Sequence, residues 1–182
     1  VGYLESNRAA DVEEFREAAE KAAYSMNWFY ADTGGDIAHF YLGHYPVRPT
    51  GLDDRLPAPG NGEFEWAGFA PFADNPSCVN PKQGYLAQWN NQPGPGWRNG
   101  ERQSGWGSAN RVEAIMDFLA PNPAVNFSDL QEVVRRAGLI DVTAKYFKED
   151  LIAAAAKVDD PKVQQAVAQL RAWDNMWADV DK

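Results

Sequence analysis

The sequence has 182 residues, about the length of one domain and enough to build a hydrophobic core. Its 17 basic and 26 acidic residues give a formal net charge of −9 at pH 7 and a pI near 4.7. This charge repels phosphate backbones and anionic membrane surfaces, so we expect neither nucleic acid nor a membrane as a partner. Cys78 is the single cysteine, which excludes a disulfide within the chain.

The N-terminal part predicts one helix and one β-hairpin. Asp11 followed by Glu14 is typical of a helix start. Apolar residues then recur at spacings of three and four, as a buried helix stripe requires: Val12, Phe15, Ala19, Ala22 and Met26. The aromatic and β-branched runs 27–32 and 37–43 flank a Gly-Gly turn, which predicts a hairpin. Neither run alternates cleanly with polar residues, so we expect the hairpin to be covered on both faces.

Residues 46–107 are rich in Pro, Gly and Trp and show little periodicity, apart from a strand-like segment, GYLAQW, at 84–89. Irregular stretches of this length are usually functional loops or surfaces that rest on other parts of a protein.

Residues 108–182 predict a helical subdomain. The first helix, ANRVEAIMDFLA, stops before Pro121, and Ser128 with Gln131 predicts the cap of a second. Segments 142–158 and 161–173 predict two more helices, the last with Pro161 in its first turn.

Most candidate site residues have an ordinary structural interpretation. His39 and His44 lie in or beside an aromatic strand, where a histidine without a visible partner is more often structural than a ligand or a base. Seven Trp and seven Tyr suggest carbohydrate or cation binding, but most lie in apolar runs, which favours core packing. The glycines of GPGWRNG miss the dinucleotide-binding spacing. Local spacing indicates no Ser or Cys nucleophile.

The paired amides Asn90 and Asn91 follow Trp89 directly. A side-chain amide is a neutral donor that can be aimed at a developing oxyanion. Asparagine also serves turns, and the local sequence favours loop capping around Pro93. Arg111 could clamp a carboxylate or carbonyls near a site or form a surface ion pair, and the sequence does not decide between them.

Four segments, read together, favour a catalytic interpretation of Asn90 and Arg111: NWFYADTGGDIAHFYLGHYPVR, GLDDRLPAPGNGEFEWAGFAPF, NPKQGYLAQWNNQP and WGSANRVEAI. In order and spacing they resemble an internal part of the catalytic β chain of penicillin acylases, a family that includes acyl-homoserine-lactone and cephalosporin acylases. The resemblance implies an N-terminal nucleophile hydrolase with an αββα sandwich. In that family, self-cleavage of a precursor exposes a Ser that forms an acyl-enzyme from an amide. We therefore expect an α+β fragment, with the helix, hairpin and strand of a partial sandwich in residues 1–107 and the helical subdomain in 108–182.

The resemblance also implies roles for individual residues. Asn90 matches the asparagine whose amide forms half of the family's oxyanion hole, and Arg111 matches the arginine that supports the active site. Met26 falls where the family places an apolar residue that lines the acyl pocket. The family often binds a structural calcium ion, with one ligand a backbone carbonyl near the position matching Asp54 and another a carboxylate in the loop before the WG motif. The spacing of that loop differs here, and only Glu101 could supply the carboxylate. Calcium takes about six to eight oxygen ligands, so most would come from other parts of the protein.

No cofactor is expected for catalysis. The chain begins at Val1 rather than at the nucleophile, so we expect its partners to be the remaining α-chain and β-chain segments of the same precursor, together with a small amide substrate. The isolated chain should be inactive. Without the other segments of the precursor, the unpaired faces of its hairpin should expose apolar surface and make the chain self-associate. The resemblance implies a periplasmic or extracellular location. The alternative function is a non-catalytic, aromatic-rich binding or interaction module on the same scaffold.

Overall fold

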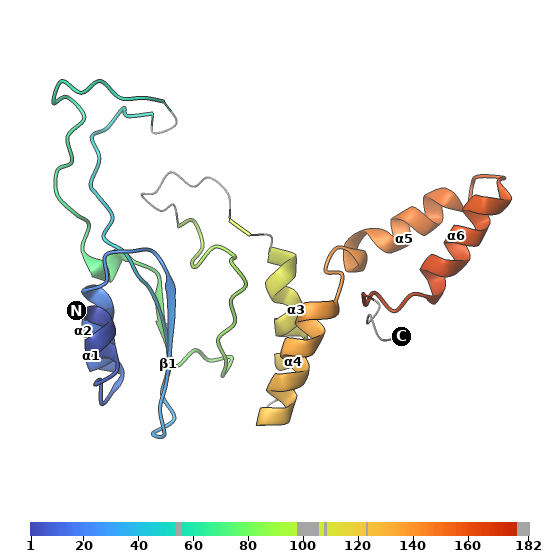
Figure 1. The fold of residues 1–182 in the computed structure, drawn as a ribbon, viewed down its shortest axis with the longest axis horizontal. Coiled ribbons are helices and arrows are strands. Elements are labelled where there is room, and N and C mark those ends of the chain that lie inside the picture. The colour runs from blue at the N-terminus through green and yellow to red at the C-terminus, as the bar shows by residue number, and fades with distance from the viewer. Residues whose placement is uncertain (54–55, 98–105, 108, 123, 178–182) are drawn as a thin grey trace. The chain divides into compact units, whose positions relative to one another are not determined.

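The computed structural model describes residues 1–53, 56–97, 106–107, 109–122 and 124–177. The chain divides into two compact units, residues 1–107 and 108–182. Within the described ranges, the first unit contains two α-helices, one 3-10 helix and a three-stranded antiparallel sheet, and the second contains four α-helices (Figure 1). The predicted mixture of helices and antiparallel strands is therefore confirmed.

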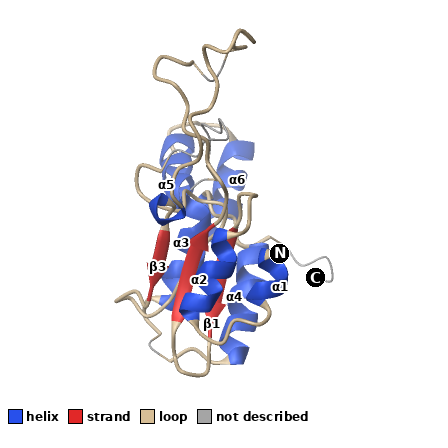
Figure 2. Cartoon of the chain, turned by 90° about the vertical axis from the view of Figure 1, so that its left-hand side faces the viewer, coloured by secondary structure: helices blue, strands red, loops and turns tan. Residues whose placement is uncertain are grey.

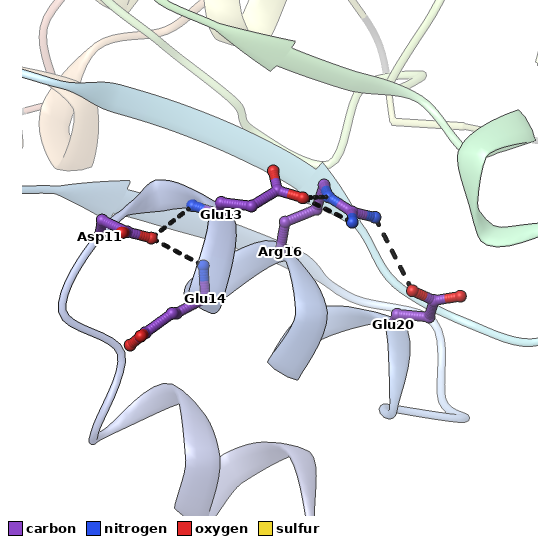
Figure 3. A network of polar contacts seen from close by, with 5 residues as sticks. All are labelled: Asp11, Glu13, Glu14, Arg16 and Glu20. Atoms are coloured by element: carbon purple, nitrogen blue, oxygen red, sulfur yellow. Dashed lines mark hydrogen bonds and ion pairs between the residues drawn. The ribbon is translucent and has the colours of Figure 1, made fainter.

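Helix α2 (Val12–Glu20) begins where the sequence predicts. The Asp11 side chain caps it by accepting hydrogen bonds from the backbone N–H groups of Glu13 (3.0 Å) and Glu14 (2.9 Å). On its exposed side, Arg16 pairs with Glu13 at 2.6 Å and with Glu20 at 3.7 Å (Figure 3). Exposed ion pairs of this kind stabilise a helix only slightly, so the cap and the buried stripe define the element.

The predicted burial of the stripe is confirmed except at Met26, but the helix ends at Glu20, before Ala22. Ala19 and Ala22 are buried in the core, and Val12 and Phe15 pack against it. Met26 lies outside the helix and is 45% exposed. The helix ends early because the chain must enter the first strand at Asn27, and the Met26 carbonyl accepts the N–H of Leu42 (2.8 Å) across the hairpin.

The predicted hairpin consists of β1 (Asn27–Ala31) and β2 (Ile37–Tyr41), which pair antiparallel from Asn27 opposite Tyr41 to Ala31 opposite Ile37. A third strand, β3 (Ser77–Val79), pairs with the other edge of β2. The sheet order is β1-β2-β3.

One face of this sheet carries the core of the first unit. Trp28 and Phe40 are cross-strand neighbours on that face, and the Phe15 ring of α2 lies 5.6 Å from Trp28 and 6.2 Å from Phe40. Figure 2 shows α1 and α2 in front of the strands, and α2 packs on both β1 and β2.

The opposite face is also covered at β2. His39 and Tyr41 are buried there, and the Tyr41 ring meets Trp97 at 6.2 Å and Trp106 at 5.9 Å, both from the long irregular segment. The expectation that the hairpin is covered on both faces is confirmed for β2.

Helix α1 (Gly2–Ser6) was not predicted, because five residues are too few to show a helical period. Contacts with α2 hold it. A side chain on Gly2 would lie 2.6 Å from the Ala18 carbonyl oxygen, so only glycine allows this close approach. Lys21 also forms an ion pair with Glu5 at 2.6 Å.

The strand predicted at 84–89 is wrong: these residues are all described, and none belongs to a strand. A strand needs a neighbour with free backbone groups. Residues 77–79 occupy the open edge of β2, with Val79 opposite Ala38, so that edge is not available to the GYLAQW segment.

The second unit contains the four predicted helices, α3 (Ala109–Leu119), α4 (Phe127–Leu139), α5 (Ala144–Ala155) and α6 (Pro161–Ala172). Helix α3 packs with α4, and α5 packs with α6. In the described part of the chain, no helix combines the length and apolar character needed to cross a membrane.

The predicted cap of α4 is wrong by two residues. Asn126, not Ser128, is the N-cap, and it forms a reciprocal capping box with Asp129. The N-cap Asp160 and the first-turn Pro161 of α6 agree with the predicted start of that helix.

Candidate active site

The candidate site is the turn at residues 88–91, which the side-chain amides of Gln88 and Asn91 close. The Asn91 side-chain oxygen accepts the Trp89 backbone N–H at 2.9 Å, and the Gln88 side-chain NH2 donates to the Asn91 carbonyl at 3.1 Å. Asn91 therefore has the turn-forming role that the local sequence favours.

Asn90 lies at the tip of this turn with a left-handed backbone, φ 57°. Asparagine is one of the few residues that tolerate this conformation. Its N–H donates to the Gln88 side-chain oxygen (2.8 Å), and its carbonyl accepts the N–H of Gly107 (2.6 Å). The Asn90 side chain is exposed and makes no hydrogen bond to a described residue. This neutral donor is thus carried by a backbone that two hydrogen bonds hold in place.

A cavity of about 280 Å³ lies beside the turn, lined by Gln88 and Asn91 as well as by apolar side chains. Three residues at its sheet side, Phe29, His39 and Cys78, are cross-strand neighbours on β1, β2 and β3. The other apolar lining comes from the loop: Pro81, Leu86, Ala87 and Pro93. This mixture of apolar walls and a few amides is typical of a small-molecule pocket.

His39 is a structural histidine. Its Nε2 lies 2.7 Å from the Asn27 side-chain oxygen, so that nitrogen is the donor, and its ring packs 5.1 Å from Phe29. Burial lowers the pKa of His39 below its usual 6.5, which favours the neutral imidazole. Asn27 was not predicted as the partner, although its diagonal position on the same face of an antiparallel pair is a usable signal.

His44 has a structural partner as well. Its Nε2 donates to the Glu20 carbonyl at 2.8 Å, at the end of α2. For both histidines, the structural interpretation that the sequence favoured is confirmed by these bonds.

Asn90 is not among the residues that line this cavity, and neither are the other predicted site residues that the structure describes. Met26 is exposed and absent from its lining. Arg111 lies near the start of α3 in the second unit, half-buried and engaged with neighbouring groups. Their roles stay predictions.

The two predicted calcium positions, Asp54 and Glu101, lie outside the described residues. Within the described ranges, no three His, Cys, Asp or Glu side chains gather in a group that could hold a metal ion. The calcium site stays a prediction, and no chemistry is derived from it.

Comparison with known proteins decides the family. The penicillin amidase family model matches residues 2–181. The chain belongs to the penicillin amidase family. This confirms the family resemblance of the four sequence segments, including the one that carries Asn90.

Two curated relatives illustrate the range of the family. The chain is 36% identical over 179 residues to penicillin G acylase from Escherichia coli, which covers 97% of the chain and 21% of the relative. It is 32% identical over 118 residues to the acyl-homoserine lactone acylase QuiP from Pseudomonas syringae pv. syringae, which covers 64% of the chain and 14% of the relative.

The fold agrees with a solved family structure. The thermostable penicillin G acylase from Alcaligenes faecalis matches with a TM-score of 0.82 and 32% identity, over 96% of this chain and 32% of that chain. The chain thus spans about a fifth of the length of the E. coli relative and about a third of the solved one.

Proposed function

We propose that the complete protein containing this chain hydrolyses an amide between an apolar acyl group and an amine, with Asn90 stabilising the oxyanion. One observation carries the assignment to Asn90. Of the four amide side chains at 88–92, those of Gln88, Asn91 and Gln92 bond to the loop backbone, whereas that of Asn90 bonds to no described residue.

The proposed chemistry follows from the family resemblance. The N-terminal Ser of the processed precursor attacks the amide carbon through its hydroxyl oxygen, and the proton passes to its own α-amine. The carbonyl oxygen becomes an oxyanion, to which the Asn90 NH2 donates. The C–N bond then breaks, the amine leaves with the proton, and water hydrolyses the acyl-enzyme. An amide donor carries no titrating proton, so this stabilisation does not depend on the protonation of Asn90.

The other parts of the proposal concern the whole protein. The first unit belongs to an αββα sandwich that remaining segments of the precursor complete, and those segments supply the nucleophile. Arg111 supports the active site, and Met26 contributes to the acyl pocket. The protein acts in the periplasm or outside the cell. The names of the relatives, a penicillin G acylase and an acyl-homoserine lactone acylase, support an acylase and leave the acyl group and the amine open.

The test is Asn90→Ala in the full-length gene product, assayed with a chromogenic phenylacetyl or fatty-acyl anilide. Loss of one oxyanion donor should lower kcat by about a hundredfold to a thousandfold. Asn90→Asp should lose at least as much, because a carboxylate cannot donate and repels the oxyanion. Asn61→Ala is the matched control: Asn61 is another exposed asparagine of the same unit, and its side chain accepts the Glu63 N–H in its own turn.

Near-normal turnover in Asn90→Ala would remove Asn90 from the site. A correctly folded full-length protein that cleaves no acyl anilide would instead favour the alternative, a non-catalytic binding module. Circular dichroism of each variant separates loss of chemistry from loss of fold.

A further inference from the structure

We propose that Gly107 is a positioning residue for Asn90. Its backbone N–H and its lack of a side chain hold the main chain of Asn90 in place. This inference rests on the proposed function, because it assigns a purpose to the position of the Asn90 amide.

The contact between the two residues leaves no room for a side chain at 107. The Gly107 N–H donates to the Asn90 carbonyl at 2.6 Å. A Cβ on Gly107 would lie 2.5 Å from that oxygen, 3.0 Å from the carbonyl carbon and 3.2 Å from the Asn90 Cβ. The closest neighbours are backbone atoms, which cannot rotate away as a flexible side chain could. Any larger residue must therefore displace Asn90.

The backbone of Asn90 has the conformation that needs such support. It is left-handed, with φ 57°, and the second hydrogen bond that fixes it runs from its own N–H to Gln88 at 2.8 Å. The Asn90 side chain has no bond of its own to a described residue. Since nothing described holds the amide directly, its position depends on the backbone, and Gly107 constrains one side of that backbone.

Aromatic contacts anchor Gly107 to the sheet. Its neighbour Trp106 packs edge-on against Tyr41 of β2, with ring centroids 5.9 Å apart. Tyr41 is buried and stacks on Tyr45 at 6.2 Å. The chain of contacts therefore runs from a buried strand through Trp106 to Gly107, and from Gly107 to Asn90.

The reason for glycine at this position is the close approach and not the backbone angle. Gly107 is not among the positive-φ glycines, so alanine could adopt its φ. Gly60 shares that property, but a Cβ there would meet nothing within 4 Å. The pair Gly107→Ala and Gly60→Ala thus makes the same chemical change with and without the contact to Asn90.

The experiment uses the full-length gene product and the acyl anilide assay. Gly107→Ala should lower kcat by about a hundredfold, the usual effect of moving a catalytic group by roughly 1 Å. KM should change little, because the oxyanion exists only in the tetrahedral intermediates and the transition states that lead to them, and not in the bound substrate. Gly60→Ala should match the parent protein in both constants.

A double-mutant cycle separates positioning from a general structural effect. If Gly107 acts through Asn90, adding Gly107→Ala to Asn90→Ala should cost almost nothing further in kcat. Equal losses from Gly107→Ala in both backgrounds would overturn the proposal, as would parent-like activity of Gly107→Ala. A Gly107→Ala protein that fails to fold would also overturn it, because the contact would then support the fold and not one side chain.

These outcomes are distinguishable from failure of the proposed function. If Asn90→Ala alone leaves turnover normal, the assignment of Asn90 fails, whatever Gly107 does. If Asn90→Ala loses activity and the cycle is additive, the oxyanion role stands and only the role of Gly107 is lost.

Discussion

At the scale of single residues, His39 couples folding to pH. Burial lowers the pKa of His39 below its usual 6.5. Between that lowered pKa and 6.5 the unfolded chain binds more protons than the folded chain. The stability that the neutral imidazole contributes is therefore complete above pH 6.5, is lost as pH falls toward the lowered pKa, and changes no further below it.

We expect His39→Gln to reduce this pH dependence, because glutamine can still donate to the Asn27 side-chain oxygen and does not titrate. Urea unfolding midpoints of the parent and variant chains at about pH 7.5 and about pH 5.5 test this. The parent should lose more stability than the variant between the two pH values. Equal losses would show that another group causes the pH dependence.

The amides of residues 88–92 show how alike side chains acquire different roles. Asn91 and Gln92 bond to nearby backbone groups, at 2.9 Å to Trp89 and 2.7 Å to Trp97 respectively. Asn90 shares their chemistry, but its backbone is left-handed and contacts Gly107, and its amide bonds to no described residue. Backbone geometry, more than residue type, separates the candidate catalytic amide from its neighbours.

At the scale of elements, the start of α4 tests the capping geometry. The Asn126 side-chain oxygen accepts the N–H groups of Ser128 (2.8 Å) and Asp129 (3.2 Å), and the Asp129 carboxylate accepts the Asn126 N–H (2.9 Å). Asn126→Ala should therefore destabilise the second unit by about 1 kcal/mol. Chemical denaturation with a helix signal measures the change.

Ser128→Ala is the matched control for this prediction. Ser128 is the residue that the sequence pattern selected, but it lies inside the helix and its side chain does not cap it. Alanine has the better helix propensity, so Ser128→Ala should leave stability unchanged or slightly raised. A larger loss from Ser128→Ala than from Asn126→Ala would contradict the observed cap.

At the scale of the whole molecule, many large apolar side chains of the described residues are exposed, and contiguous exposed apolar patches favour association. In the hairpin the residues of β2 are mostly buried, but Phe29 of β1 is 47% exposed. Helix α4 also carries an exposed apolar row at helical spacing, formed by Phe127 (75% exposed), Leu130 (48%) and Val134 (73%). In the first unit, Trp66 and Phe69 are each 58% exposed.

We therefore expect the isolated 182-residue chain to self-associate in solution, as light scattering would show by a mass that rises with concentration. Replacing Phe127 and Val134 by serine should lower the associated mass at little cost to the fold, because both side chains are exposed. A parent chain that stays monodisperse and monomeric would contradict the prediction.

Much of the local structure of this chain could be predicted from its sequence. The apolar spacing of Phe15 and Ala19, the Gly-Gly turn of the hairpin and the first-turn Pro161 all specify elements through short-range physics. Backbone preferences and helical periodicity act over a few residues, so the sequence alone carries them. The four matched segments likewise identified the family.

The tertiary structure decided the rest, because those features depend on residues far apart in the chain. Helix α1 forms because Gly2 fits against Ala18, and the edge of β2 is taken by 77–79 and not by 84–89. The state of Asn90 depends on Gly107, which lies 17 positions along the chain but within hydrogen-bonding distance. A sequence pattern can identify the amide, but only folding brings the two residues together.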